Sequence, residues 1–394
     1  NAAPNGGRFC NLYYLIKEMS MSKEENRKNF SKYVSQNILG MIGFSCYVLA
    51  DSYFISIAKG ADGLTALNLV MPLYSIIFSI GEMIGVGSAI RYAISKIKKD
   101  ADADDYFWNA IIWCIMSSMI FVFAGIFFSA DIMRVLGADE HIVAVGNNYT
   151  KIFMCFAPMF MCNYVTNAFV RNDGAPGIAM SATLFSSLFN IVFDYILMFP
   201  MNLGMEGAAL ATALTPIIGM GICSIHFFSK KSSVRLVVCK PSVRKLVAGS
   251  QLGVSAFVGE MSSAVITLAF NFVILKLTGN VGVAAYGVVA NIAIVTTAVF
   301  NGVAQGSQPL ISSCFGRGDK DGCTQLKRMG YTTAFVLAAV MYSILFIFAG
   351  QFVAVFNSEG SEMLRLYATE GVKLYFIGIF FEIGRASCRE RVST

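Results

Sequence analysis

Four acidic residues stand inside long apolar stretches of this sequence: Asp51, Glu82, Asp194 and Glu260. A charged side chain in the middle of a membrane-spanning helix costs about 3 kcal/mol on insertion scales, so such residues are rare and usually functional. Two carboxyl groups in one buried site can share a proton, because burial and like charge both disfavour ionisation. The same oxygens can also bind a sodium ion, since hard cations prefer oxygen ligands.

Asp51 and Asp194 are the best candidates for such a pair. Asp51 lies in YVLADSYFI and Asp194 in NIVFDYILMF, and both belong to the first half of the chain. Asn190 precedes Asp194 by one helical turn and therefore shares its face, and Thr212 could add a hydroxyl. These groups suit H⁺ and Na⁺ equally, so the ion stays open. The alternative for Asp51 is an interfacial position near a helix end.

A second polar group could lie in the other half, where Glu260 and Gln305 fall in successive apolar stretches. Such a group would be a second ion or substrate site. Glu82 has glycines nearby and could instead brace close helix packing. The cysteines are scattered and only two histidines occur, so we expect no metal site beyond Na⁺ at Asp51 and Asp194, and no cofactor.

The elements that position these residues must be membrane helices. Hydrophobic residues make up 56% of the 394 residues and charged residues 14%, whereas a soluble domain carries roughly a quarter charged residues. A spanning helix needs about 20 mostly apolar residues. About ten stretches qualify, near 34–57, 64–94, 107–129, 142–170, 178–200, 207–229, 247–276, 283–313, 329–349 and 361–381.

Lysine and arginine are distributed unevenly over the connecting segments. If the N-terminus is cytoplasmic, the inside segments carry most of them, including the basic segment 230–245, and the outside segments carry only Lys59, Arg134, Lys276 and Arg365. This pattern follows the positive-inside rule. It explains the net charge of +6 through contact with the lipid bilayer, without nucleic acid.

The chain also contains an internal repeat with an offset of 219 residues, in which Gly87 corresponds to Gly306 and Asp100 to Asp319. A period of six spans keeps both halves in the same orientation, as in transporters with parallel repeats. We therefore predict an all-α polytopic membrane protein with two pseudo-symmetric six-helix lobes, of whose twelve spans about ten are present. The expected parts are 1–20 (non-native or upstream), 21–229 (N-lobe), 230–246 (linker), 247–381 (incomplete C-lobe) and 382–394 (adapter-derived).

Three stretches resemble the multidrug and toxic compound extrusion (MATE) transporters. DSYFISIAKGADGLTALNLVMPLY (51–74) is similar to the first-to-second span of that family, and NIVFDYILMFPMNLGMEGAALATA (190–213) to its fifth-span Asn-x-x-x-Asp run. NGVAQGSQPLISSCFGRGD (301–319) resembles its second-half signature. The stretches occur in the family's order, and the resemblance covers about 30–381.

The resemblance implies export of organic, often cationic, compounds in exchange for H⁺ or Na⁺ by alternating access. It implies an ion-coupling site at Asp51, Asp194, Asn190 and Thr212, with Tyr149 as a polar aromatic of the same network. Other branches of the family use an acidic residue in the seventh span, where Glu260 lies. Family members often have a proline before the first-span Asp that is thought to bend the helix, but Gln36 stands there, which puts such bending in doubt here.

No GxxxxGK[ST] phosphate loop and no HExxH or GxSxG motif occurs, so we expect neither ATP hydrolysis nor an enzyme. We expect a monomer in a bacterial plasma membrane that binds a small organic substrate. The alternatives are a flippase for lipid-linked saccharides, which would need more basic residues than Arg91, Lys151 and Lys373 in its spans, and a non-transporting receptor or scaffold.

Overall fold

The computed structural model describes residues 23–100, 102–356 and 362–380. Within these ranges the secondary structure is helical: α2 (Lys23–Ile97), α3 (Asp105–Val135), α4 (Glu140–Cys155), α5 (Ala157–Asn172), α6 (Pro176–Met198), α7 (Gly204–Phe227), α8 (Val243–Arg317), α9 (Lys320–Ile347), α10 (Ala349–Phe356), α11 (Glu362–Tyr375) and the 3₁₀ turn η1 (Phe376–Gly378). The expected segments 1–20 and 382–394 lie outside the described residues. The prediction of an all-α polytopic fold is confirmed.

Two helices are too long for a single crossing of the membrane. A helix of 75 residues such as α2 or α8 would extend about 110 Å. α2 reverses at Gly60, whose φ of 60° and ψ of −143° are not helical, and its two arms are Lys23–Gly60 and Asp62–Ile97. The second arm of α8 is Ala285–Arg317. Each long helix therefore supplies a hairpin of two antiparallel arms.

Seven helices of the described residues are long and apolar enough to span a membrane, or eight if α4 and α5 form one span. α4 and α5 meet at a bend of 46°, where we expected one continuous stretch over 142–170. Pro158 explains the bend, because its ring lacks an N–H and clashes with the carbonyl one turn earlier. The expected spans 247–276 and 361–381 are not among those found in this part of the chain.

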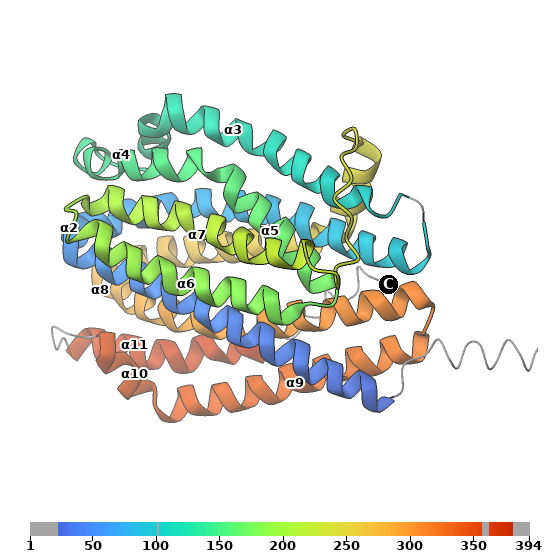
Figure 1. Ribbon diagram of the computed structural model, residues 1–394. Coiled ribbons are helices and arrows are strands. Elements are labelled where there is room, and N and C mark those ends of the chain that lie inside the picture. The colour runs from blue at the N-terminus through green and yellow to red at the C-terminus, as the bar shows by residue number, and fades with distance from the viewer. Residues whose placement is uncertain (1–22, 101, 357–361, 381–394) are drawn as a thin grey trace, which may run out of the picture.

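The helices form two groups, each with its own hydrophobic core (Figure 1). The core of the N-terminal half (Lys23–Phe227) consists of residues between Ile55 and Val234. The core of the C-terminal half (Val243–Gly378) consists of residues between Ala285 and Ile379. A smaller cluster that includes Phe30, Val34, Val303 and Ile311 joins the two halves.

The halves pack closely at two glycine-rich crossings of α2 with α8. A Cβ on Gly253 would lie 2.0 Å from the carbonyl oxygen of Met83, and one on Gly87 would lie 2.1 Å from that of Gly249. A Cβ on Gly306 would lie 2.7 Å from Cα of Val34. The contacts Gly87–Gly253 and Gly306–Val34 are related by the 219-residue repeat. The internal symmetry of the sequence therefore has a counterpart in the packing of the two halves.

One end of the bundle carries the segment that joins the halves, residues 228–242, which we call the linker (Figure 1). The N-terminus of α2, the turn between α2 and α3 and the turn between α5 and α6 lie at the same end. This is also where the basic segments gather, including Lys96, Arg171 and Lys230. We call it the linker end.

Candidate functional site: buried carboxyl groups in the N-terminal half

Five of the predicted site residues come from four helices of the N-terminal half. Asp51 lies on the first arm of α2, Tyr149 on α4, Asn190 and Asp194 on α6, and Thr212 on α7. All five are buried, with exposed fractions between 0% and 7%. The side chain of Asp51 is therefore enclosed by the protein and does not lie on its surface.

The polar atoms of this group are only partly paired. Asn190 Nδ2 donates a long hydrogen bond of 3.4 Å to Oγ1 of Thr212. Asn190 Oδ1, Asp51 Oδ1 and both carboxylate oxygens of Asp194 are buried and accept no hydrogen bond from the described residues. An ionised carboxylate buried without a partner is very unfavourable, so a proton or a bound cation would stabilise the two carboxyl groups.

The two carboxyl groups lie close enough to interact electrostatically. Because both belong to one site, adding the second negative charge is harder than adding the first. The oxygens of Asp51, Asp194 and Asn190, with the hydroxyl of Thr212, make a donor set that fits either a proton or Na⁺. No cluster of three or more His, Cys, Asp or Glu residues that could hold a metal occurs in the described ranges.

Tyrosines surround the acids. Tyr47, Tyr74 and Tyr149 each interact electrostatically with both Asp51 and Asp194. The hydroxyl oxygens of Tyr74 and Tyr149 lie 2.5 Å apart. The ring of Tyr74 stacks on Phe153, with centroids 3.6 Å apart. Tyr149 was predicted from the sequence, whereas Tyr47 and Tyr74 were missed, since polar aromatics in apolar stretches gave no distinguishing signal.

The three remaining candidates are not gathered as expected. Gln305, on α8, accepts a hydrogen bond from Arg171 Nη1 of α5. Gln305, Arg171 and Glu82 line one small cavity of about 20 Å³ between the halves. Glu260 is partly exposed and does not line this cavity. The structure thus places Gln305 with Glu82 at the contact between the halves, where we expected a shared site with Glu260.

Comparison with known proteins identifies the family. The model of the MatE family matches residues 37–196 and 256–389. This chain belongs to the MatE family. The match covers both halves, and it includes Asp51, Asn190 and Asp194, while Thr212 falls between its two parts. The resemblance noted in the sequence is therefore confirmed at the level of the family.

Individual relatives agree with this assignment. Over 336 residues the chain is 27% identical to the multidrug export protein MepA of Staphylococcus aureus, covering 84% of this chain and 72% of MepA. MepA of Staphylococcus saprophyticus is 25% identical over 332 residues, which are 82% of this chain and 72% of that protein.

Solved structures share the fold of this MatE protein. One is described as the outward-facing conformation of a multidrug resistance MATE family transporter; it has a TM-score of 0.85 and 18% identity, and the match covers 100% of this chain and 87% of that one. A MOP superfamily transporter from Pyrococcus furiosus matches with the same values. At this identity the comparison speaks for the fold alone.

Proposed function

We propose that this MatE protein is a secondary antiporter that exports organic, cationic or amphipathic compounds in exchange for H⁺ or Na⁺. The observation that carries the proposal is the buried pair Asp51 and Asp194 in one half of a duplicated helical bundle, where Asp51 Oδ1 and both carboxylate oxygens of Asp194 accept no hydrogen bond from the described residues. Uptake of a positive ion there neutralises charge that burial makes costly. The relatives named as multidrug export proteins support export as the direction of transport.

The coupling follows from one free-energy argument. An ion that binds more tightly in one conformation of the transporter shifts the population toward that conformation. The two halves would act as two lobes that open alternately around a central path, and the ion bound at Asp51 and Asp194 would bias which side is open. The protein would work as a monomer without a cofactor.

The decisive experiment is efflux of a cationic dye from proteoliposomes under separately imposed H⁺ and Na⁺ gradients. We expect one of the two gradients to drive efflux, and Asp51→Asn or Asp194→Asn to lower the driven rate about tenfold or more. Ser187→Ala is a matched control on α6, because its hydroxyl bonds only to the carbonyl of Thr183 in the same helix. Gradient-driven efflux that survives both Asp variants would refute the coupling role.

The orientation of the protein is a second part of the proposal. The concentration of lysine and arginine at the linker end supports a cytoplasmic location for that end and for the N-terminus, in a bacterial plasma membrane. A cysteine introduced at the exposed Lys230 should then react with a membrane-impermeant thiol reagent only after cells are permeabilised. Equal labelling of intact cells would reverse the orientation.

The alternative flippase function is less well supported. Lipid-linked pyrophosphates need basic side chains in the central cavity. Lys151 is exposed, Lys373 bonds to Glu370, and neither these residues nor Arg91 lines a cavity of about 740 Å³ in the C-terminal half. A receptor or scaffold function would not account for the buried, unpaired carboxylate oxygens of the N-terminal half.

A further inference from the structure

Three consecutive residues at the end of α5 connect the parts of the molecule at the linker end. α5 ends at Asn172, and Gly174, with φ of 86°, turns the chain toward Pro176 at the start of α6. Arg171 and Asn172 contact the C-terminal half, while Asp173 contacts the linker.

The contacts of Arg171 and Asn172 cross from one half to the other. Arg171 Nη1 donates to Oε1 of Gln305. Asn172 and Gln308 exchange two hydrogen bonds: Asn172 Nδ2 donates to Gln308 Oε1 at 3.3 Å, and Gln308 Nε2 donates to Asn172 Oδ1 at 3.1 Å. Gln305 and Gln308 are three residues apart on α8 and so lie on one face, opposite the end of α5.

Both sides of this contact are held in position by their own half. Asn37, on α2, accepts a bond of 3.4 Å from Arg171 Nη1. Gln308 Nε2 donates to Oγ of Ser312 one turn later at 3.0 Å. Arg171 is 7% exposed and Gln308 is 4% exposed. A buried guanidinium with fixed acceptors on both halves stabilises the contact and also fixes its geometry.

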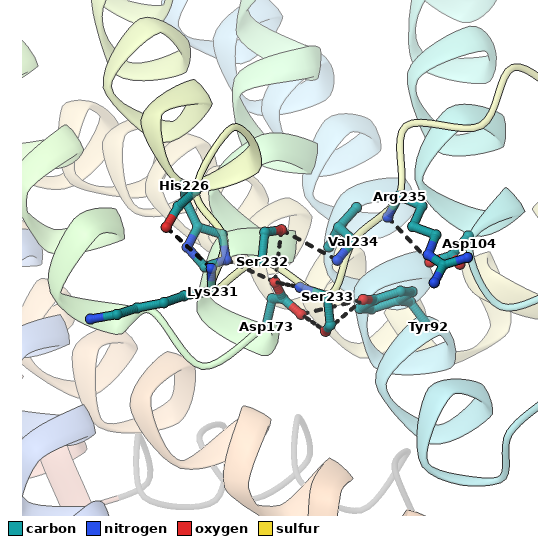
Figure 2. Close-up of polar contacts among 10 residues, drawn as sticks. Tyr92, Asp104, Asp173, His226, Lys231, Ser232, Ser233, Val234 and Arg235 are labelled. Carbon is teal, nitrogen blue, oxygen red and sulfur yellow. Dashed lines mark hydrogen bonds and ion pairs between the residues drawn. The ribbon is translucent and has the colours of Figure 1, made fainter.

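The contacts of Asp173 stay within the N-terminal half and the linker (Figure 2). Its carboxylate lies 2.8 Å from His226 Nε2 of α7, and it accepts from the backbone N–H of Ser233 at 2.9 Å and from the hydroxyl of Ser232 at 3.1 Å. It also accepts from Tyr92 of α2 at 3.3 Å and from the hydroxyl of Ser233. A relative movement of the two halves therefore leaves these bonds intact.

More bonds fix the rest of the linker to the same half. The backbone N–H of Arg235 donates to Asp104 at 3.3 Å, and that of Ser242 donates to Asn109 at 2.6 Å. Lys245, in the first turn of α8, forms an ion pair with Asp105. The linker is thus bonded to the N-terminal half at several points between Ser232 and Ser242, and the first turn of α8 is bonded to it as well.

We propose that Arg171 and Asn172 form a latch with Gln305 and Gln308 that holds the linker end of the transporter closed, while Asp173 keeps the linker on the N-terminal half when the latch opens. The proposal rests on the proposed function, because only an alternating-access cycle requires the halves to separate. Opening the latch breaks the bonds of Arg171 and Asn172 to Gln305 and Gln308 and none of those at Asp173.

The chemistry of the latch suits a contact that must open repeatedly. Amide and guanidinium groups can exchange their protein partners for water when this end opens, so the net contribution of each bond is small compared with its strength in isolation. The nearby glycine crossings provide close packing but no groups that gain from hydration. If apolar side chains alone closed this end, opening would expose their whole surface to water, and the free-energy cost would be proportional to that area.

Spin labels at Lys28→Cys on α2 and Thr324→Cys on α9 can report the opening directly. Both positions are exposed, and they flank a contact of 3.3 Å between Asn26 and Gln325 that joins the halves. Distance distributions would be measured by electron–electron resonance in nanodiscs, in a Cys46→Ser background because Cys46 is exposed. The measurement needs neither substrate nor transport.

The variants should move this distribution in opposite directions. Gln305→Leu removes one bond between the halves and should raise the ratio of open to closed molecules about fivefold, whereas Gln308→Leu removes two and should raise it about 25-fold. Gln305→Glu places a carboxylate at position 305, opposite Arg171, and should lower the ratio about fivefold. A folding defect cannot imitate this second result, since it would not favour the closed state.

Asn167→Leu is the matched control. Asn167 also lies on α5, but its bonds of 3.4 Å go to Ala179 and Thr183 within the N-terminal half, so the distribution should not change. Asp173→Ala should make a spin label at Val237→Cys more mobile, which narrows the lines of its electron spin resonance spectrum. It should not change the open-to-closed ratio. Unchanged distributions in the Gln305 and Gln308 variants would overturn the latch, whereas absent dye efflux with shifted distributions would count against the proposed function alone.

Discussion

The interiors of the two halves differ at positions that the repeat makes equivalent. Asp51 in the N-terminal half corresponds to Phe270 in the C-terminal half, and Tyr74 corresponds to Ala293. Asp51 lies in the packed interior of the N-terminal half. Phe270 lines a cavity of about 740 Å³ in the C-terminal half and stacks on Tyr286, with ring centroids 5.5 Å apart. Equivalent backbone positions thus carry an ionisable group in the N-terminal half and an aromatic ring in the C-terminal half.

This difference teaches that duplication of a scaffold does not duplicate its chemistry. The helix crossings at Gly87 and Gly306 are kept in both halves, because they determine how the halves pack. The carboxyl group of Asp51, by contrast, has no counterpart at the equivalent position, which is Phe270. Under the proposed function, the N-terminal half would bind the ion and the aromatic cavity would bind apolar parts of a substrate.

The largest effect should come from equal substitutions at the two equivalent positions. Asp51→Leu should lower gradient-driven dye efflux about tenfold or more, because the ion loses its carboxylate. Phe270→Leu should leave the driving ion unchanged and raise the half-saturating dye concentration about threefold, through lost aromatic contact. Initial rates over a range of dye concentrations measure both values. Equal losses of driven rate would remove the functional contrast between the halves.

The two glycine crossings should differ in their tolerance of a methyl group. Gly253→Ala should destabilise the protein by about 2–3 kcal/mol, because the new Cβ would lie 2.0 Å from the carbonyl oxygen of Met83. Gly306→Ala, with a nearest approach of 2.7 Å, should cost about 1 kcal/mol. Thermal unfolding of the two variants in detergent measures which of them is less stable.

Gly221→Ala on α7 is the control for these substitutions, because nothing lies within 4 Å of its new Cβ. It should be neutral or should stabilise by up to about 1 kcal/mol through helix propensity. A Gly306 variant less stable than the Gly253 variant would show that the two crossings are not packed as the structure has them.

A smaller effect is expected from the tyrosines beside the acids. Tyr149→Phe removes the hydroxyl that lies 2.5 Å from Tyr74, which should cost about 1 kcal/mol and lower driven efflux a few-fold. Tyr195→Phe changes an exposed ring on α6 and should alter neither property. Unfolding midpoints and efflux rates measured on the same preparations test this. If both variants behave alike, the hydroxyl pair has no part in the site.

The smallest effect should come from Thr212→Val, which removes the partner of Asn190 at 3.4 Å. A bond this long is weak, so the ion concentration for half-maximal efflux should rise less than about threefold. Thr215→Val, on the same helix, loses only a bond to the carbonyl of Ala211 and should leave that concentration unchanged. A loss as large as that of the Asp variants would make Thr212 a main ion ligand.

Much of the N-terminal site could be predicted because its signals are local. A charge in an apolar stretch is visible for Asp51 and Asp194, and helical periodicity alone puts Asn190 on the face of Asp194. The structure adds their common burial, the partner of Thr212 and the tyrosines. Whether these residues carry the ion remains a prediction.

The contact between the halves could not be predicted in the same way. Arg171 meets Gln305 across 134 residues of sequence, and Asn172 meets Gln308 across 136. Such pairs depend on how the helices assemble, which periodicity does not determine. The bend between α4 and α5 was also missed, although Pro158 could have indicated it.

The attachment of the linker has a consequence for how the protein is made. Among the described residues, the side chains that bond to the linker precede it in the chain: Tyr92 on α2, Asn109 on α3, and Asp104 and Asp173 in the turns beside α3 and α5. Since domains generally fold as units during synthesis, N-terminal part first, the ribosome delivers all partners of this attachment before the spans of α8 have emerged. The N-terminal half can thus fold and bind the linker in the bilayer first, and the C-terminal half then packs against the folded N-terminal half.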